Sequence, residues 1–506
     1  MTSRINNKKI TKNTIALYVR MGISMIISFF TTRITLQVLG VEDYGLNNLV
    51  AGVVSMFSFI NASMGTAVQR FYSIEIGKNN KERLSKVFGT GLYLHILVAL
   101  ITLLLAELFA VFFLHKLEIP ENRMFAAHII FQISVISLIL NIISVPYTAL
   151  LRAREEFTVI AFVQIIDSFF KLGTLYLLLY IKFDKLILLS ILNFAITCFH
   201  LGTLTYYARR YKEAHSKVVR DKALIKEMLS FISMLLITVL ALLGRDQGLV
   251  VLINLFFGLT VNAAYAITMQ VIQIANTFVT NFKQAIIPQL MSSYGSGDLS
   301  SMYKLINFGT KITFVLMLLI TFPLIFEGDY LLSIWLGEVP QHTTKLLIIA
   351  SIFINIDSFT YFHYQAVHAT GNVVRQQTII STLYILNIGI IYILFVLGLN
   401  FYSALWINII ISIIKAFINI YYCHKQTSYD IITFFKTIVL KCIALVVIIS
   451  VIGCIISTNT ETNLSSFCFK TLILLSSIIT LSVFLVFNKN ERNKLLNLLK
   501  LKLRKN

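Results

Sequence analysis

The sequence is poor in charge, and this scarcity excludes most classes of protein. Charged residues make up 13% of the 506 residues, whereas hydrophobic residues make up 57%. Apolar runs of about 18 residues or more recur from end to end, which no soluble globular class shows. The alternation of apolar and polar residues that is typical of an outer-membrane barrel is missing. The sequence therefore predicts an all-α polytopic membrane protein.

Cysteine is also scarce, and the motifs of common enzymes are absent. The five cysteines show no metal-ligand spacing and no disulfide framework. The chain has no Walker A sequence, no GxSxG, no HExxH and no CxxC pair. Its few carboxylates form no acid–base pair in any outer loop, and no loop is large enough to be a separate domain. We therefore expect no catalytic residues, no metal site, no bound cofactor and no ATP hydrolysis.

The net charge of +20 would suggest a nucleic-acid partner in a soluble protein. Here most basic residues lie in loops on one side of the predicted spans, while the opposite loops are relatively acidic. This asymmetry indicates orientation in a bacterial cytoplasmic membrane with both termini in the cytoplasm, and no nucleic-acid partner. The basic N-terminus resembles a signal peptide, but the apolar segment behind it is too long and lacks a cleavage site, so it is expected to remain as the first span.

The apolar runs and the breaks between them predict about fourteen spans. Their approximate bounds are 13–39, 46–71, 88–114, 125–151, 157–181, 186–208, 229–257, 261–287, 305–326, 345–367, 376–398, 402–422, 432–457 and 467–487.

The longest polar loop, residues 209–228, divides the spans into two groups. We predict a six-helix bundle in residues 1–208, this basic cytoplasmic linker, and a second six-helix bundle in residues 229–424. Residues 425–506 hold two extra helices and a basic cytoplasmic tail. The alternative for the linker is an amphipathic helix that lies on anionic lipid.

An internal repeat supports the two bundles. At an offset of 220 residues, Gln69 matches Gln289, Gly77 matches Gly297, and the tripeptide Phe-Gly-Thr at 88–90 recurs at 308–310. Six spans separate the two copies, and because this number is even the repeats are parallel rather than inverted. The alternative is chance similarity between apolar segments.

Charged residues inside the spans are the candidate functional residues, because a charge at the centre of a bilayer costs at least about 2.5–3.5 kcal/mol. Arg20 and Arg245 lie deepest, in the first span of each half, and are expected to line one cavity. The other candidates for a basic cavity are Arg33, Lys171, Lys311 and Lys415.

Two close pairs of charges have a structural alternative. Asp167 and Lys171 are four residues apart on one helical face, so they can neutralise each other as an ion pair. Arg245 and Asp246 are adjacent and about 100° apart around the helix, so we expect them to pair poorly with each other.

Three of the candidate cations lie near predicted span ends. Lys311, Lys415 and Arg33 can therefore extend toward the membrane surface instead of lining a cavity. Two acids, Asp357 and Asp246, are the candidates for binding a coupling Na⁺ or proton, with a structural hydrogen bond as the alternative for each.

A basic cavity implies an anionic cargo, because the planar guanidinium of arginine can bond two phosphate oxygens at once. Few deep acids accompany these cations, which disfavours a cationic cargo.

Residues 33–45, RITLQVLGVEDYG, resemble the signature at the end of the first span in bacterial polysaccharide flippases. These are the Wzx-type O-antigen and repeat-unit exporters of the multidrug/oligosaccharidyl-lipid/polysaccharide (MOP) superfamily. The stretches 61–77, 150–161 and 369–380 are similar to loops of that family. The resemblance covers nearly the whole chain in order and span count.

The resemblance implies a MATE-like architecture of two six-helix bundles around a cavity that opens alternately to each side, with two extra helices outside. It implies that the cargo is an undecaprenyl-pyrophosphate-linked oligosaccharide, moved from the cytoplasmic to the outer leaflet for O-antigen, lipopolysaccharide or capsule synthesis. In that picture Arg20 and Arg245 hold the pyrophosphate while the lipid tail stays in the membrane lipid. The polysaccharide polymerase machinery is a further expected partner.

Three alternatives remain open. A lipid II flippase has an equally basic cavity and a similar cargo. A cation-coupled multidrug exporter of the same superfamily would be expected to carry unpaired acids in its cavity. A membrane enzyme of the same pathway, such as a polymerase, would need a sizeable outer loop that this chain lacks.

Overall fold

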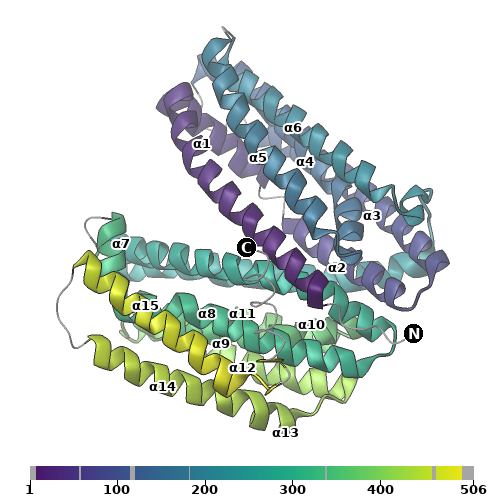
Figure 1. Cartoon of the computed structure of the whole chain (residues 1–506). Helices are drawn as coiled ribbons and strands as arrows, with labels where there is room; N and C mark the ends of the chain where they lie inside the picture. Colours follow the sequence, from purple (N-terminus) through teal and green to yellow (C-terminus); the bar gives the residue numbers. More distant parts are fainter. Residues whose placement is uncertain are drawn as a thin grey trace, which may run out of the picture. The chain divides into compact units, whose positions relative to one another are not determined.

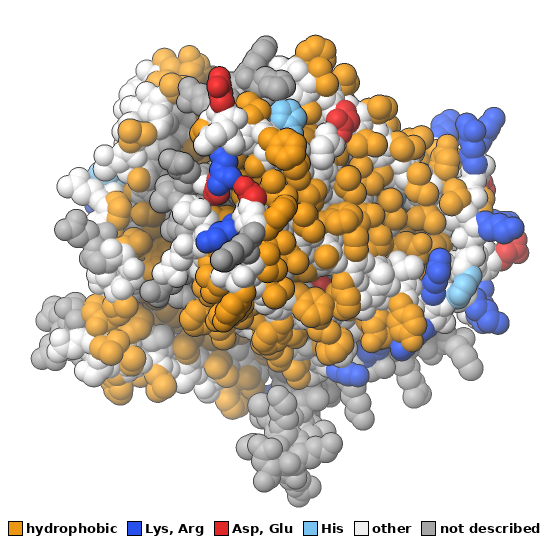
Figure 2. Space-filling model, turned by 90° about the horizontal axis from the view of Figure 1, so that it is seen from above, with side chains coloured by type: hydrophobic (Ala, Val, Ile, Leu, Met, Phe, Trp, Pro, Cys, Tyr) orange, Lys and Arg blue, Asp and Glu red, His pale blue; other side chains and the backbone are white. Residues whose placement is uncertain are grey.

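The computed structural model describes residues 7–55, 59–113, 120–181, 183–336, 339–457, 463–489 and 491–492. Every regular element in these ranges is helical, which confirms the all-α fold class (Figure 1). Eleven helices of the described chain are long and apolar enough to cross a membrane. Figure 2 shows a broad band of apolar side chains on the surface, with lysine and arginine gathered at one edge of it. The chain is a multi-pass membrane protein.

The N-terminal helices follow the predicted spans closely. They are α1 (Asn7–Ser55), α2 (Phe59–Gly77), α3 (Lys81–Phe113), η3 (Glu121–Arg123), α4 (Met124–Ala153), α5 (Phe157–Tyr180), α6 (Lys185–Ala208) and the short η4 (Lys212–His215). The carboxylate of Asp184 caps α6 by accepting bonds from the backbone amides of residues 186 and 187.

The C-terminal helices begin with the longest element of the chain. They are α7 (Lys222–Gly295), α8 (Leu299–Leu336), α9 (Thr343–Phe359), α10 (Tyr361–Thr370), α11 (Val374–Val396), α12 (Tyr402–Thr427), α13 (Ile431–Phe434), η5 (Phe435–Val439), α14 (Leu440–Ser457), α15 (Leu464–Leu481) and η6 (Ser482–Val486). Asp221 caps α7 as Asp184 caps α6.

The helices form two compact units. Unit 1 is Met1–Val239 with Ile287–Asp298, and unit 2 is Leu240–Ile286 with Leu299–Asn506. In unit 1, α4 packs against α2, α3 and α6, while α1 packs along α5. In unit 2, α9 packs against α8 and α12, and the extra helices α14 and α15 lie against α8.

A glycine breaks the first long helix of each half. Gly40 divides α1 and Gly258 divides α7, and both residues have a φ of 79° with ψ close to 180°. Only glycine adopts this backbone readily, because it has no Cβ. The predicted first span therefore ends at Gly40, and the chain re-enters a helix directly after it. The two glycines are 218 residues apart.

The predicted tenth span, 345–367, is not one continuous helix. α9 ends at Phe359 and α10 begins at Tyr361, with Thr360 between them outside helical geometry. The amide of Asn419 on α12 donates to the Thr360 hydroxyl at 3.1 Å. This side-chain partner holds the break in place, a feature that apolar periodicity alone does not reveal.

A second pair of glycines forms a reciprocal helix crossing within unit 1. A Cβ on Gly77, at the end of α2, would lie 2.9 Å from the Cα of Ser292 on α7. A Cβ on Gly295 would lie 2.9 Å from the Cα of Ile74 on α2. Each contact is the copy of the other at an offset of 218 residues, so the register of 220 taken from the sequence matches is two residues too long here. The helix backbones touch only because both positions lack a side chain.

This crossing predicts that alanine at Gly77 or Gly295 destabilises the protein. The added methyl group would overlap a neighbouring backbone that cannot move aside, with an expected cost of about 1–3 kcal/mol. The unfolding midpoint of the purified protein in detergent measures the effect. Gly389→Ala is the control, because its methyl group would meet open space. Equal stability of Gly77→Ala and the control would contradict the close packing.

Candidate functional site

Unit 1 contains a polar cavity of about 490 Å³ among α1, α4, α5 and α6. We call it the N-site. Its polar lining consists of Arg20, Ser24, Asn141, Gln164, Asp167, Ser168, Lys171, Thr197 and His200. Two predicted cavity residues, Arg20 and Lys171, therefore line the same cavity.

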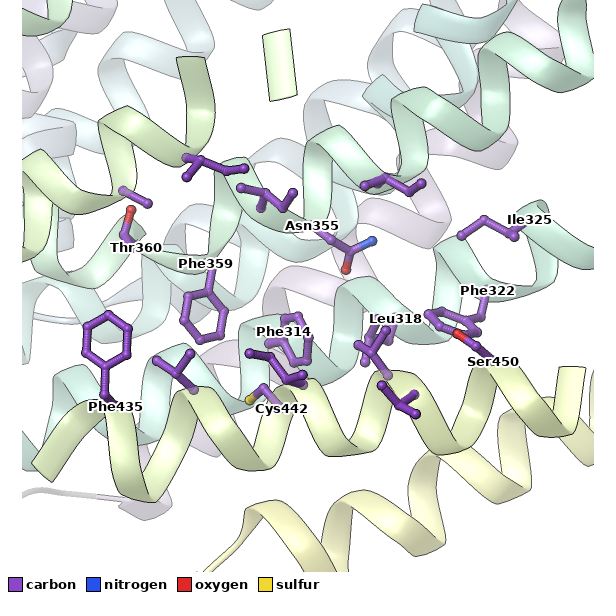
Figure 3. A pocket seen from close by; sticks show the side chains of 18 of the residues that line it. Phe314, Leu318, Phe322, Ile325, Asn355, Phe359, Thr360, Phe435, Cys442 and Ser450 are labelled. Atoms are coloured by element: carbon purple, nitrogen blue, oxygen red, sulfur yellow. The ribbon is translucent and has the colours of Figure 1, made fainter. Parts of the chain in front are cut away.

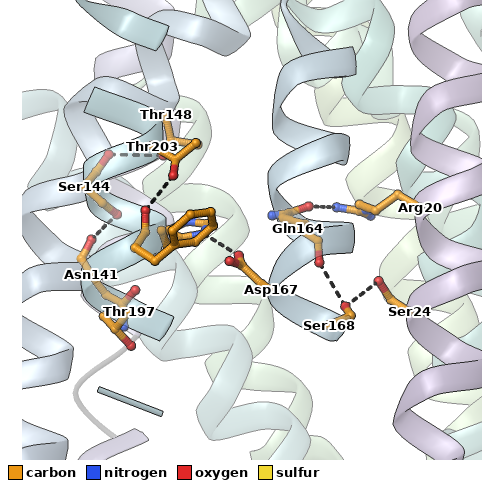
Figure 4. A network of polar contacts seen from close by, with 12 residues as sticks. Arg20, Ser24, Asn141, Ser144, Thr148, Gln164, Asp167, Ser168, Thr197 and Thr203 are labelled. Carbon is orange, nitrogen blue, oxygen red and sulfur yellow. Dashed lines mark hydrogen bonds and ion pairs between the residues drawn. The ribbon is translucent and has the colours of Figure 1, made fainter. Parts of the chain in front are cut away.

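Polar contacts join α1 to α5 along one side of the N-site. The guanidinium of Arg20 donates from Nη1 to Oε1 of Gln164 at 2.6 Å (Figure 4). One turn further along α1, the Ser24 hydroxyl lies 3.1 Å from the hydroxyl of Ser168 on α5. These contacts hold Arg20 at the cavity wall with a neutral neighbour, so the Gln164 contact does not cancel its positive charge.

The acid of the N-site faces α6 rather than its predicted partner. Oδ2 of Asp167 lies 2.6 Å from Nδ1 of His200 (Figure 4). Both side chains are described, and no ion pair joins Asp167 to Lys171, so that predicted pair is wrong. Asp167 points across the cavity to the neighbouring helix, and its other oxygen, Oδ1, is buried without a hydrogen-bond partner. Lys171 keeps its charge available to the cavity.

Unit 2 holds a second group of charges, which we call the C-site. It consists of Arg245, Asp246, Lys283, Asp357, Ser412, Lys415, Tyr361 and Tyr384 from α7, α9, α10, α11 and α12. Three cations share this group with two carboxylates. The N-site has two cations and one carboxylate, so cations outnumber carboxylates in each unit.

Arg245 pairs with its neighbour in the chain, which corrects the expectation that the two would pair poorly. Its Nε and Nη2 donate to Oδ1 of Asp246 at 2.9 and 2.7 Å. The arginine stem is long enough to fold back along the helix, so the rotation of about 100° between neighbouring residues does not prevent the contact. The guanidinium also lies over Tyr384, 4.9 Å from the ring centroid.

The candidate coupling acid Asp357 is already neutralised. It accepts a hydrogen bond from the Ser412 hydroxyl at 2.9 Å and forms an ion pair with Lys415 on α12. The Lys415 side chain is 12% exposed, so it packs inside unit 2 and does not extend toward the membrane surface. A cation that bound Asp357 would have to displace the lysine.

Sequence reasoning missed Lys283, which lies on α7 inside the predicted span 261–287. Its residue exposure is 4%, and its Nζ lies 4.6 Å from the ring centroid of Tyr361. It is close enough to Asp357 and Lys415 to interact electrostatically with both. The signal was a lysine within an apolar run, and its proximity to the end of the run obscured it.

The last two predicted cations do not belong to either site. Lys311 on α8 is 2% exposed and donates to Oε2 of Glu491 at 2.8 Å. This ion pair fixes the segment after η6 to α8, so it is a structural contact rather than a cavity wall or a side chain reaching the membrane surface. The side chain of Arg33 lies outside the described residues.

The largest cavity described is apolar. It has a volume of about 720 Å³ in unit 2, between α8, α9, α12 and the η5–α14 segment (Figure 3). Phe314, Phe322 and Phe359 line it. Asn355 is among its few polar residues, and its amide group donates to Thr321 and to the Ser351 carbonyl oxygen. A cavity of this chemistry does not bind an anion, so recognition of charge falls to the N-site and the C-site.

The pairing in the C-site predicts that Asp357→Asn destabilises the protein, because Lys415 loses its counter-charge. We expect a cost of about 2–3 kcal/mol, below that of a fully buried pair since 26% of the Asp357 side chain is exposed. The double variant Asp357→Asn/Lys415→Met should recover most of this loss. Unfolding midpoints in detergent provide the measurement, and an unchanged midpoint for the single variant would contradict a structural pair.

Comparisons with known proteins agree with this architecture. Residues 16–177 match the family model described as MatE. The uncharacterised membrane protein EpsK of Bacillus subtilis (strain 168) is 21% identical over 341 residues, and the alignment covers 65% of each protein. The chain thus spans about two thirds, and slightly less, of that relative's length.

Solved structures share the fold over most of the chain. A mutant MATE protein superposes with a TM-score of 0.71 at 13% identity, covering 83% of this chain and 96% of that one. A MOP superfamily transporter from Pyrococcus furiosus superposes with a TM-score of 0.64 at 13% identity and the same coverage. The latter is described as having a binding pocket of reverse polarity that suggests a different function. The family match and the shared fold together identify the chain as a relative of the MATE-type transporters of the MOP superfamily.

Proposed function

We propose that this protein is a flippase for undecaprenyl-pyrophosphate-linked oligosaccharide repeat units. It would move them from the cytoplasmic to the outer leaflet by alternating access, for synthesis of a cell-surface polysaccharide such as O-antigen or capsule. The observation that carries the proposal is the excess of cations over carboxylates in both the N-site and the C-site.

The chemistry of the two sites suits a pyrophosphate. Arg20 bonds to a neutral amide and Lys171 forms no ion pair among the described residues, so both charges are available to an anion in the N-site. Arginine binds phosphate through two parallel hydrogen bonds, whereas lysine acts as a compact point charge. The serines, Asn141 and Thr197 around them have the donors and acceptors that sugar hydroxyls need.

The setting of the proposed activity follows from the sequence. The distribution of basic loops favours a bacterial inner membrane with both termini in the cytoplasm. Undecaprenyl lipid would stay in the bilayer, and the polymerase that extends the polysaccharide is the expected downstream partner. A coupling Na⁺ or proton at Asp357 or Asp246 would have to compete with Lys415 or Arg245.

A multidrug exporter of the same fold is the second candidate. One observation favours it, because Asp167 carries a buried oxygen without a hydrogen-bond partner and could receive a cation. Against it, the nearby Arg20 and Lys171 repel a cationic drug. A lipid II flippase shares the chemistry of the basic sites and differs only in the sugar, so transport of defined lipids has to separate the two flippase activities.

The test is transbilayer movement of a fluorescent undecaprenyl-pyrophosphate oligosaccharide in liposomes that contain the purified protein. We expect Arg20→Ala to slow the movement about tenfold or more, because a charge-assisted hydrogen bond to the anion is lost. Arg20→Lys should retain part of the rate, and Arg375→Ala, on the exposed surface of α11, is the matched control.

Three results would change the assignment. Movement that survives Arg20→Ala would keep the flippase and remove Arg20 from its site. Faster movement of lipid II than of other lipid-linked sugars would favour the lipid II flippase. Efflux of a cationic dye without movement of any lipid-linked sugar would establish the multidrug exporter instead.

A further inference from the structure

Lys283 is a buried cation without a counter-charge. Among the residues that the structure describes, no carboxylate lies within ion-pair distance of its Nζ, and no side chain or carbonyl accepts a hydrogen bond from it. Its closest polar neighbour is an aromatic face, that of Tyr361 at 4.6 Å. A buried ammonium that donates no hydrogen bond is costly, so its retention needs an explanation.

The carboxylates of the C-site are committed to other cations. Asp246 accepts two hydrogen bonds from Arg245, and Asp357 is held by Lys415 and Ser412. Asp357 therefore offers Lys283 only a distant attraction, which the repulsion from Lys415 opposes. After these pairs are formed, the charge that remains in the C-site is the charge of Lys283.

The surroundings of Lys283 hold it in place without cancelling its charge. The hydroxyl of Tyr361 accepts a hydrogen bond from the amide of Gln365 at 3.0 Å, which fixes the ring that Lys283 faces. An aromatic face attracts an ammonium through its quadrupole but leaves the three N–H groups free to donate. Nζ is not among the buried atoms that are sealed from solvent and lack a partner, so a small ligand can reach it.

We propose that Lys283 is the anion-binding residue of the C-site and that its ligand is a phosphate or pyrophosphate group. The proposal rests on the flippase function in naming this anion, whereas the unpaired charge stands independently of it. Arg245 and Lys415 shape the potential around the site but spend their hydrogen bonds on carboxylates. Lys283 is the residue whose three donors remain for the ligand.

The experiment uses the full-length protein in lipid nanodiscs and two probes. The first probe is inorganic pyrophosphate, followed by isothermal titration. The second is undecaprenyl pyrophosphate incorporated in the nanodisc, followed by its ability to reduce pyrophosphate binding. The two probes distinguish a site for the free anion from a site for the lipid headgroup.

We expect Lys283→Met to weaken pyrophosphate binding about 10- to 100-fold, because a charge-assisted hydrogen bond is lost while the packing on Tyr361 is kept. Lys283→Arg should bind within a few-fold of the wild type. Lys304→Met, which removes an exposed lysine of α8, is the matched control and should bind normally. The unfolding midpoint of Lys283→Met should equal or exceed that of the wild type, because no ion pair is broken.

Equal pyrophosphate affinity in the wild type and Lys283→Met would overturn the proposal, as would a large loss of stability in that variant. Binding that needs Lys283 but is unaffected by undecaprenyl pyrophosphate would assign the site to a free anion and leave the flippase function to be judged by transport. Transport of lipid-linked sugar that is unchanged in Lys283→Met would remove Lys283 from the flippase while leaving the proposed function intact.

Discussion

The cost of an uncompensated charge in a hydrocarbon layer governs the interior of both units. Most charges inside the described helices are paired with a partner on another element. Lys415 pairs with Asp357, Lys311 with Glu491, and Lys470 on α15 lies 3.6 Å from Glu327 on α8. These pairs join helices that lipid-like packing alone would hold weakly, since side chains gain little hydrophobic free energy by leaving lipid for protein. The two extra helices are attached to unit 2 in this way.

The departures from pairing then become informative. Arg20 is bonded to a neutral amide, Lys171 forms no ion pair with Asp167 beside it, and Lys283 faces an aromatic ring. Each is a cation, and they occur in both units. A membrane protein tolerates such groups where water or a ligand reaches them. The two polar sites thus share one chemical character although different helices build them.

Much of the fold could be predicted from the sequence, because apolar runs of bilayer length set the helices and basic loops set their order. The breaks could not be predicted equally well. Gly40 ended its predicted span correctly, since a glycine between two apolar runs is a local signal. The break at Thr360 depends on Asn419, 59 residues away, and no local pattern records that contact. The repeat register differed by two residues at the glycine crossing for a similar reason, because backbone proximity decides it.

For the sites, the sequence located the charges and did not supply their partners. Arg20 meets Gln164 across 144 residues, and Lys311 meets Glu491 across 180. Helical spacing suggested Asp167 with Lys171, but a neighbouring helix offered His200 instead. Lys283 escaped attention because a lysine near the end of a span is ordinarily explained by a side chain that reaches the membrane surface.

The unpaired lysine has an electrical consequence. With three cations and two carboxylates, the empty C-site carries a net positive charge inside a membrane span, and a bound pyrophosphate more than offsets it. A voltage that is negative on the cytoplasmic side therefore draws the empty site inward and drives the loaded site outward. At about 2.3 kcal/mol per elementary charge per 100 mV, this force acts on both halves of a transport cycle in the productive direction. A carrier built in this way is driven by voltage even when no ion travels with its cargo.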